Sequence, residues 1–395
     1  MRRARAMSRR GVWFFVSLAV GLAALAGEGC HAHVQAEPAL FKAAPFSPIA
    51  VGTQPLDIAL ADLNDDGSLD MVTANVASKD ITVLLNNGRG GFSASPTSPA
   101  PTGLASHLVA VADFNGDEKP DLAVTAHASN GVAVLLGDGK GGFTAAPGSP
   151  FAALQSSSPH NHGLVLGDMN ADGHCDIVTA NSDNSSVSVL LGDGRGGFSP
   201  AVGSPFAVGR RAYMPAIGDV NGDGQLDVTV PNFGDATVSV LLGNGAGALC
   251  AAPGSPLPVH QRPYCTALGD LNADSALDLV VSQDDALLVV LLGDGAGGFG
   301  EALGSPVDAG QRGYRLRLVD VNADGRTDLI TGTAGSAVSV LLGDGHGGFE
   351  IAPGSPFAVG TGPWGVEVGD INGDDKQDIV TSNQESNNIS ILLGQ

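Results

Sequence analysis

The nonapeptide Asp219-Val220-Asn221-Gly222-Asp223-Gly224-Gln225-Leu226-Asp227 carries the pattern from which the fold of this chain can be worked out. Its opening string, Asp-x-Asn-x-Asp, starts at seven places along the chain, namely Asp62, Asp113, Asp168, Asp219, Asp270, Asp320 and Asp370. Successive copies begin 51, 55, 51, 51, 50 and 50 residues apart. A nearly constant period of this length indicates repeated units that bury their apolar faces against one another.

Each copy has the pattern of four short strands. In the third copy, residues 164–167 precede the aspartate-rich loop, 177–180 follow it, 187–191 alternate in polarity, and a glycine-rich turn leads to a fourth strand near Phe198. No segment shows a sustained apolar period of 3.6 residues, so we expect few helices. The sequence therefore predicts an all-β protein, a seven-bladed β-propeller of four-stranded antiparallel blades. A β-solenoid is the alternative, although its coils are usually shorter than this period.

The two ends of the chain complement each other. The seventh copy stops at Gln395 without the Gly-Gly-Phe and Ser-Pro segment that closes most other copies, and residues 41–52 match that segment as it occurs at 349–360. An N-terminal strand that completes the last blade would remove two exposed sheet edges. We therefore predict one propeller domain over residues 37–395.

Residues 1–36 have the pattern of an export signal. A basic start is followed by an uncharged apolar run at 12–26 and by small residues at Val34 and Ala36; the basic residues are Arg2, Arg3, Arg5, Arg9 and Arg10. The sequence thus predicts an extracytoplasmic protein, secreted, periplasmic or at the cell surface, with no transmembrane segment in its mature chain. A signal anchor, a twin-arginine signal at Ser8-Arg9-Arg10 and a lipid-bearing Cys30 are the alternatives.

Charge and cysteine content narrow the classes of partner. The formal net charge of -22 repels phosphate backbones, so we expect no nucleic-acid partner. Beyond residue 36 the cysteines are Cys175, Cys250 and Cys265, an odd number that argues against a full disulfide framework. Cys250 and Cys265 either pair or serve as small buried residues.

The aspartate-rich loop has the donor pattern of a calcium site. Side-chain oxygens at positions one, three, five and nine can converge on one cation, and glycine at position six permits a sharp turn. Hard oxygen donors suit Ca²⁺, whereas without a cation the carboxylates repel one another at close range. A solvated surface turn is the alternative for a single loop. An EF-hand is excluded because position twelve is Thr or Val in every copy and strands flank the loop.

These motifs resemble the FG-GAP/VCBS repeat proteins, whose blades look like those of the integrin α-subunit N-terminal propeller. The resemblance covers residues 41–395 and implies that each loop joins the first two strands of a blade and binds a structural Ca²⁺, up to seven in all. The complete sites would be Asp62, Asn64, Asp66, Asp70; Asp168, Asn170, Asp172, Asp176; Asp219, Asn221, Asp223, Asp227; and Asp320, Asn322, Asp324, Asp328.

Three copies depart from the family pattern because position six is not glycine. They are Asp113, Asn115, Asp117, Asp121 with Glu118; Asp270, Asn272, Asp274, Asp278 with Ser275; and Asp370, Asn372, Asp374, Asp378 with Asp375. A left-handed backbone costs free energy for such residues, less so for aspartate. We therefore predict weaker sites at Asp113 and Asp270, and a nearly intact one at Asp370.

A second set of equivalent positions lies at the start of each innermost strand. Six residues before each first aspartate are Leu56, His107, His162, Tyr213, Tyr264, Tyr314 and Trp364, and two residues further back are Gln54, Ala105, His160, Arg211, Arg262, Arg312 and Gly362. In a propeller such positions ring the channel mouth. Aromatic faces beside arginine suit sugars, acidic sugars or a carboxylate-bearing peptide. The alternative is packing that closes the inner end of each blade.

Two smaller features complete the candidates. His160-Asn161-His162 lies in the longest copy, either as a metal pair or catalytic element or, as we expect, as a surface loop insertion. Arg315 and Arg317 face the register of Glu367, which predicts an ion pair between blades.

The sequence as a whole favours a binding protein. It shows no nucleophile-with-base spacing, phosphate loop or cysteine metal motif. We therefore predict a monomeric, non-enzymatic calcium-binding scaffold that recognises protein or glycan. A carbohydrate-binding lectin that uses the aromatic and arginine ring is the second hypothesis, and a polysaccharide lyase-like enzyme is the third.

Overall fold

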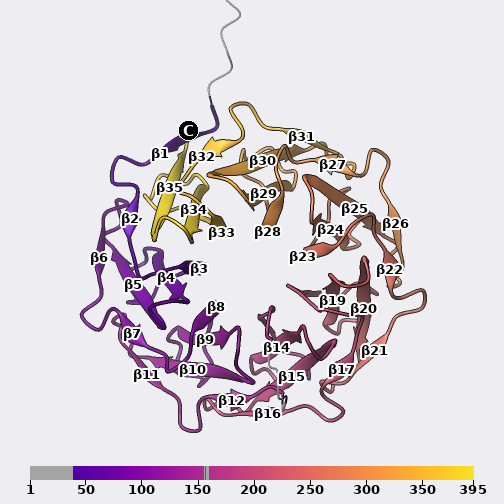
Figure 1. Ribbon diagram of the computed structural model, residues 1–395, viewed down its shortest axis with the longest axis horizontal. Helices are drawn as coiled ribbons and strands as arrows, with labels where there is room; N and C mark the ends of the chain where they lie inside the picture. The colour runs from indigo at the N-terminus through magenta and orange to yellow at the C-terminus, as the bar shows by residue number, and fades with distance from the viewer. Residues whose placement is uncertain (1–38, 155, 157–159) are drawn as a thin grey trace, which may run out of the picture. The chain divides into compact units, whose positions relative to one another are not determined.

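The computed structural model describes residues 39–154, 156 and 160–395, and every regular element within them is a β-strand. The strands form seven antiparallel sheets arranged as blades around a common centre (Figure 1). The predicted all-β, seven-bladed propeller is therefore confirmed. The predicted signal segment, residues 1–36 with Cys30, lies outside the described residues. Within the described part of the chain, no helix is long and apolar enough to cross a membrane.

The innermost strand of each blade borders the channel. In blades one to seven these strands are β3 (Pro55–Ala61), β8 (Ser106–Ala112), β13 (Val165–Gly167), β18 (Ala216–Gly218), β23 (Pro263–Gly269), β28 (Gly313–Val319) and β33 (Pro363–Gly369). The aspartate-rich loop follows the end of each of these strands, and the predicted aromatic and arginine positions precede or begin it. The two candidate sites therefore lie at opposite ends of the innermost strands.

The second and third strands of each blade form its buried centre. The second strands are β4 (Asp70–Asn75), β9 (Asp121–Ala126), β14 (Asp176–Asn181), β19 (Asp227–Asn232), β24 (Asp278–Gln283), β29 (Asp328–Thr333) and β34 (Asp378–Asn383). The third strands are β5 (Asp80–Asn86), β10 (Gly131–Gly137), β15 (Ser186–Gly192), β20 (Thr237–Gly243), β25 (Leu287–Gly293), β30 (Ala337–Gly343) and β35 (Asn388–Gly394). Every residue of the second strands is buried, because neighbouring blades cover both faces of the sheet.

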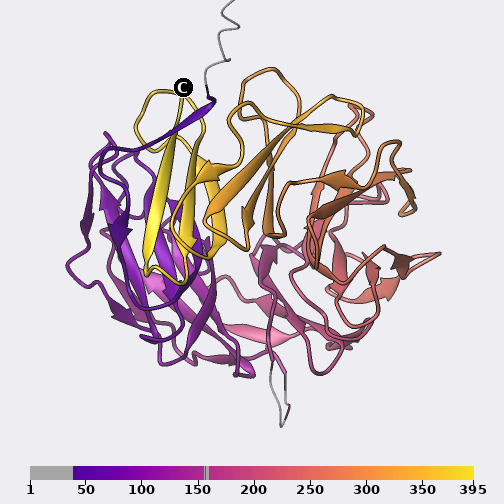
Figure 2. The same ribbon diagram turned by 45° about the horizontal axis from the view of Figure 1, so that its top comes forward.

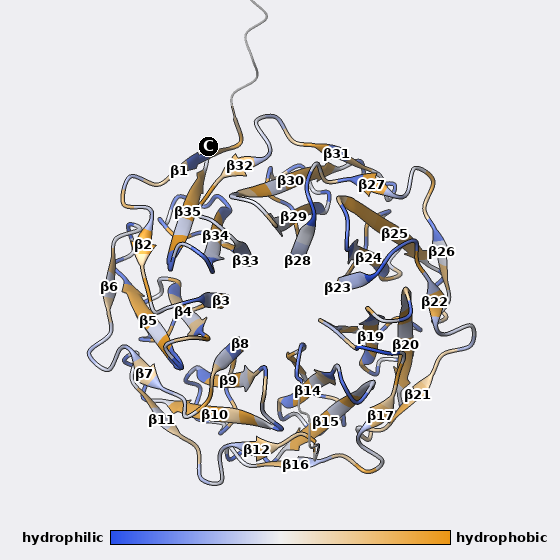
Figure 3. Ribbon diagram, in the orientation of Figure 1, coloured by the Kyte–Doolittle hydropathy of each residue, from blue (hydrophilic) through white to orange (hydrophobic). Residues whose placement is uncertain are grey.

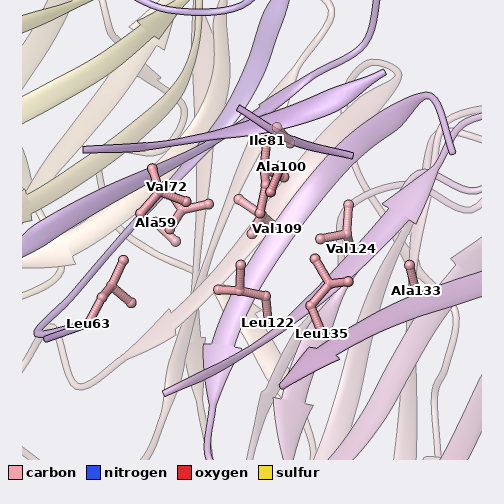
Figure 4. Close-up of a cluster of buried hydrophobic side chains, with 12 residues drawn as sticks. Ala59, Leu63, Val72, Ile81, Ala100, Val109, Leu122, Val124, Ala133 and Leu135 are labelled. Atoms are coloured by element: carbon pink, nitrogen blue, oxygen red, sulfur yellow. The ribbon is translucent and has the colours of Figure 1, made fainter. Parts of the chain in front are cut away.

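Apolar side chains hold neighbouring blades together. Between blades one and two, Val72 and Ile81 pack with Val109, Leu122 and others in one buried cluster (Figure 4). Hydrophobic colour accordingly concentrates on central strands such as β25 and β30 (Figure 3). Because each Å² of apolar surface removed from water contributes about 25 cal/mol, these interfaces stabilise the ring.

The fourth strand is split, which the sequence did not indicate. Its first pieces are β6 (Phe92–Ala94), β11 (Phe143–Ala145), β16 (Phe198–Pro200), β21 (Leu249–Ala251), β26 (Phe299–Glu301), β31 (Phe349–Ile351) and β1 (Phe41–Ala43). Its second pieces are β7 (Ala100–Pro101), β12 (Phe151–Ala152), β17 (Phe206–Ala207), β22 (Leu257–Pro258), β27 (Val307–Asp308), β32 (Phe357–Ala358) and β2 (Ile49–Ala50). Both pieces pair with the third strand.

The serine of each Ser-Pro segment bridges the gap between the two pieces. In blade three the backbone N–H of Val189 donates to Ser204 Oγ at 3.0 Å, and the equivalent bond recurs in the other six blades. A third-strand N–H that would lose its strand partner at the break is thereby satisfied. This accounts for the Ser-Pro that every repeat contains.

The N-terminal segment completes blade seven, as predicted. Phe41 pairs with Gly394 and Ile49 with Ile389, so β1 and β2 form the outer edge beside β35. The N–H of Ile391 donates to Ser47 Oγ at 2.9 Å, which places the first Ser-Pro in the last blade. Figure 2 shows the indigo N-terminal strand beside the yellow C-terminal strands.

The cysteines of the described chain are all free thiols. Cys250 lies exposed on β21, the outer edge of blade four, and Cys265 lies buried on β23, beside the channel in blade five. The disulfide alternative for this pair is therefore wrong, because the width of a blade separates the two residues.

Candidate functional site

Each aspartate-rich loop connects the first and second strands of its blade, as the resemblance implied. In blade four the first carboxylate organises the turn: Asp219 Oδ2 accepts the N–H of Gly224 at 2.7 Å. The N–H of Asp223 donates to Asn221 Oδ1 at 3.0 Å, which turns the chain back on itself. The loop is thus folded by hydrogen bonds to its own side-chain oxygens.

The aspartate at position nine has a structural role that sequence reasoning missed. Asp227 is fully buried, its Oδ2 accepts the N–H of Val220 at 2.9 Å and its Oδ1 accepts the N–H of Gly243 at 2.8 Å. The same pair of bonds recurs in all seven blades. This carboxylate therefore ties the loop to the third strand, in addition to any bond to a cation. Burial raises the pKa of Asp70 and of Asp176 to about 6.

Position six has the left-handed backbone that the sequence led us to expect. Its φ is 82° at Gly67 and 80° at Gly224, and it is 64° at Glu118, 73° at Ser275 and 65° at Asp375. The three non-glycine copies therefore adopt the same turn despite its cost. Position four is left-handed as well, which the sequence did not indicate; it is occupied by Asp65, Gly116, Ala171, Gly222, Ala273, Ala323 and Gly373.

The loop carboxylates have few cationic side chains near them. Positions one, five and nine are acidic in all seven loops. Within the described part of the chain, a single ion pair involves any of these acids. It joins Lys119 Nζ to Asp117 Oδ2 at 3.2 Å. A cluster of carboxylates without counter-charges fits a bound hard cation, for which oxygen is the preferred donor. In blade two, Lys119 supplies part of that charge itself, which is consistent with the weaker site predicted there.

We expect the left-handed position to be measurable in a matched pair of variants. A Cβ added at Gly67 would meet no heavy atom within 4 Å, so Gly67→Ala isolates the backbone cost, about 1–2 kcal/mol of unfolding free energy in calcium. Glu118→Gly removes the same strain from blade two and should gain up to about 1 kcal/mol. Denaturant melts in calcium measure both, and the idea fails if the two substitutions shift stability in the same direction.

At the opposite end of the innermost strands, aromatic rings of blades four to seven form a continuous series. Tyr213 contacts Tyr264 with ring centroids 5.4 Å apart, Tyr264 contacts Tyr314 at 5.7 Å, and Tyr314 stacks on Trp364 at 4.6 Å with an angle of 11° between the planes. The sequence register had placed these four residues at equivalent points of one ring, and the structure confirms that they adjoin. We call them, with Arg211, Arg262, Arg312 and Phe233, the aromatic-arginine belt.

Arginines lie over these rings. The Arg312 guanidinium is 4.7 Å from the centroid of Tyr264 and 5.1 Å from that of Tyr314, and Arg211 lies 4.9 Å from the centroid of Phe233. Such cation–π contacts hold the guanidinium planes against the rings. Arg312 forms an ion pair with Asp284 at 3.0 Å. Arg262 approaches the same carboxylate at 3.9 Å, and its side chain remains 64% exposed.

Packing and exposure divide the predicted ring into two parts. Leu56, His107, His162 and Tyr213 are buried, so at those positions the packing alternative holds. Tyr264, Tyr314 and Trp364 are partly exposed, and Arg211 and Arg262 are exposed. An open surface that combines aromatic rings and arginines therefore extends over blades four to seven.

Sequence reasoning missed a third equivalent position that contributes to this surface. It lies six residues after the ninth loop position and is occupied by Val76, His127, Ser182, Phe233, Asp284, Ala334 and Gln384. The N–H of Phe233 donates to the carbonyl of Arg211 at 3.0 Å, and the N–H of Asp284 donates to that of Arg262 at 2.8 Å. Comparing the copies at the end of the second strand would have revealed the chemically distinct residues His127, Phe233 and Asp284.

Blades two and three place four histidines together at the same end of the ring. His107 is the second residue of β8, His127 follows β9, and His160 and His162 precede β13. Their rings adjoin, with centroids of His127 and His160 only 3.9 Å apart. Burial lowers the pKa of His107 to about 3 and lowers the pKa of His162 below its usual range. The expected surface loop insertion at His160-Asn161-His162 is wrong in one respect, because Asn161 and His162 are buried.

Ion pairs between buried or partly buried side chains of the innermost strands link different blades. Arg317 pairs with Glu367, as predicted, whereas Arg315 Nη1 reaches Asp57 Oδ2 of blade one at 3.2 Å. Burial raises the pKa of Asp57, and the Arg315 guanidinium offsets part of that rise. A cavity of about 440 Å³ adjoins these arginines between the innermost strands. The contacts link blades one, six and seven, so we assign them a structural role.

Comparison with protein families identifies the repeat. The model described as FG-GAP-like repeat matches residues 62–124, 113–179, 168–230, 270–331 and 320–381. These ranges cover most of the chain and include all seven aspartate-rich loops. No curated protein matches the chain.

Several solved structures share the fold at low sequence identity. BBS1N, crystallised in complex with ARL6DN, is 13% identical, with a TM-score of 0.60 over 90% of this chain and 98% of that one. An Agrocybe aegerita lectin, studied for its recognition of non-reducing terminal N-acetylglucosamine, is 21% identical, with a TM-score of 0.55 over 77% of this chain and 82% of its own. A Lactobacillus plantarum protein is 14% identical, with a TM-score of 0.54 over 85% and 91% of the two chains. These likenesses show the fold alone.

Proposed function

The chain belongs to the FG-GAP-like repeat family, and from that membership we propose that it is an extracytoplasmic, calcium-stabilised propeller that binds a glycan or protein ligand without chemical turnover. The export signal expected in residues 1–36 supports the location. Two proteins of similar fold, a lectin and BBS1N in complex with ARL6DN, support recognition as the class of function.

Calcium would be held by the aspartate-rich loops. The donors are the side-chain oxygens of positions one, three, five and nine, and the carboxylates largely lack cationic side chains nearby. A bound Ca²⁺ would neutralise their mutual repulsion and fix the turn between the first two strands of each blade. Because position nine is already tied to the third strand, the ion would stabilise the blade rather than contact a ligand.

The observation that carries the binding proposal is the exposed part of the aromatic-arginine belt. A chain with a net charge of -22 concentrates Arg211, Arg262 and Arg312 beside partly exposed tyrosine and tryptophan rings at one end of its channel. Such rings stack on the apolar faces of sugars, and guanidinium groups pair with carboxylates. We therefore propose that the ligand is an acidic glycan and that the chain acts as a lectin.

A glycan array probed with the full chain in calcium tests this proposal. We expect binding to glycans that carry uronic or sialic acids, and Trp364→Ala and Arg262→Ala should each weaken it at least about tenfold, as for central binding residues elsewhere. Arg195→Ala is the matched control, because Arg195 is exposed on a glycine-rich turn outside the belt. It should leave binding unchanged.

Other outcomes point to other functions. Binding of a peptide ligand with the same dependence on Trp364 and Arg262 would retain the surface but assign it to protein recognition. Shortening of an acidic polysaccharide, abolished in His162→Ala, would overturn the non-enzymatic proposal in favour of a lyase. Equal binding by the Trp364→Ala and Arg195→Ala variants would show that the belt is not the binding surface.

A further inference from the structure

His107, His127, His160 and His162, here called the four-histidine cluster, direct ring nitrogens toward one another. The Nε2 atom of His160 lies 2.5 Å from that of His127 and 2.8 Å from that of His162. One nitrogen each of His107, His127 and His162 also fall within 4.8 Å of one another. Three separate segments of chain, from two blades, thus converge through their imidazoles.

The proton on His160 is fixed by a carboxylate. Its Nδ1 lies 3.2 Å from Asp183 Oδ1, and because a carboxylate only accepts, Nδ1 carries the hydrogen. In the neutral ring, the lone pair on Nε2 then points toward His127 and His162. A histidine whose second nitrogen donates to a carboxylate is the usual arrangement around a bound transition metal.

Hydrogen bonding among neutral rings does not account for this arrangement. One lone pair on His160 Nε2 can accept one N–H, yet two Nε2 atoms approach it at hydrogen-bonding distance. His107 adds a second unsatisfied polar atom, because its Nδ1 is buried without a hydrogen-bond partner in the described structure. An ion at the centre would accept lone pairs from several nitrogens at once. His107 and His162 are buried, and a neutral imidazole is the form that binds metals.

We propose that the four-histidine cluster binds one divalent transition metal ion of the Zn²⁺ class. Donor sets made of imidazole suit Zn²⁺, Ni²⁺, Cu²⁺ and Co²⁺, and they do not suit Ca²⁺. Zn–N bonds of about 2.0–2.1 Å in a tetrahedral site hold the nitrogens roughly 3.3 Å apart. The observed separations between the ring nitrogens lie on both sides of that value, so small rotations of the rings would bring the nitrogens to it.

The site is distinct from the aspartate-rich loops in position and chemistry. It lies at the start of the innermost strands, whereas the loops follow the ends of those strands. Its ring nearest the aromatic-arginine belt is His162, which stacks on Tyr213 with centroids 4.1 Å apart. The metal site stands whether or not the belt binds a glycan, because none of its donors belongs to the exposed part of the belt.

Zinc titration of the full chain tests the proposal. The protein is freed of transition metals and kept in excess calcium, so that the carboxylate loops do not compete for zinc. Calorimetry should then show one zinc site in the wild type that the double variant His127→Ala/His160→Ala lacks, a loss of at least about 100-fold in affinity. Asp183→Asn, which disturbs only the orientation of His160, should weaken the site by about 10-fold.

A control and a spectrum make the outcome unambiguous. His346→Ala removes an exposed histidine on a turn of blade six and should leave the titration unchanged, and His31 and His33 are present in every variant. Co²⁺ added to the wild type should give the visible absorption bands of a nitrogen-ligated ion, a readout that does not depend on any variant folding. A wild type that binds no more zinc than the double variant and shows no cobalt bands would overturn the proposal and leave the cluster as packing.

Discussion

Excess calcium chelator is expected to lower the melting temperature of this chain by roughly 10–15 °C. If each loop binds Ca²⁺ with a Kd near about 10⁻⁴ M, then millimolar calcium stabilises the folded state by about 1.4 kcal/mol per site. Seven loops together contribute roughly 10 kcal/mol, which is comparable to the net stability of a whole domain. An unfolding entropy of about 2.1 cal/mol/K per residue converts that loss into the stated shift.

The loops of this structure explain why the effect should be large. Each one connects the first two strands of its blade, and its ninth residue is bonded to the third strand, so a loosened loop disturbs three of the four strands. Neighbouring blades also meet there: the N–H of Gly247 in blade four donates to the carbonyl of Met169 in the loop of blade three at 3.0 Å. Loss of the ion therefore weakens an interface between blades as well as a turn.

Calorimetric melts with and without chelator measure the shift. Re-addition of Ca²⁺ should restore the melting temperature, whereas Zn²⁺ should restore no more than the contribution of the single histidine site. Asp223→Asn, which removes one loop charge and keeps an oxygen, should reduce the shift in melting temperature by about the contribution of one loop. Glu350→Gln, on the exposed outer edge, should not change the shift. A melting curve that is the same in excess chelator would contradict the calcium assignment.

The sequence predicted the repeat architecture well because the residues that define each repeat have strict backbone requirements. The aspartate loop and the Ser-Pro segment recur at fixed spacing, so blade number and ring closure followed from self-comparison alone. The split of the fourth strand did not follow, because the serine that bridges the gap acts through Oγ on a residue of the preceding strand, fifteen positions earlier, such as Val189 for Ser204. Spacing within one copy shows no sign of such a contact.

The candidate sites were predictable only in part. The register at the start of the innermost strand found Tyr264, Tyr314 and Trp364, because equivalent positions of a propeller adjoin around the channel. It did not find His127 or Phe233, which follow the second strand and reach the same surface only once two strands have paired. The sequence also did not predict which of these side chains are buried. His162 and Trp364 occupy equivalent positions, yet His162 is buried and Trp364 is partly exposed.

Removal of the closing segment is expected to abolish cooperative folding. A chain of residues 53–395 lacks β1 and β2, so the outer edge of β35 loses the partners of Phe41, Ile49 and their neighbours. Apolar surface is exposed with it, since Phe41 is 4% exposed and its ring lies 5.4 Å from that of Phe357 in blade six. Loss of a buried phenylalanine side chain alone costs about 3–5 kcal/mol. An unpaired apolar edge also promotes association between chains.

Complementation with a peptide distinguishes loss of closure from general damage. A synthetic peptide of residues 39–52 should add to the edge of β35 as a strand supplied in trans and restore a cooperative melt. A peptide with Phe41→Ala and Ser47→Ala should not, because it lacks the buried ring and the hydroxyl that accepts the N–H of Ile391. If the truncated chain melts at the same temperature as the full chain, β1 and β2 do not hold the ring closed.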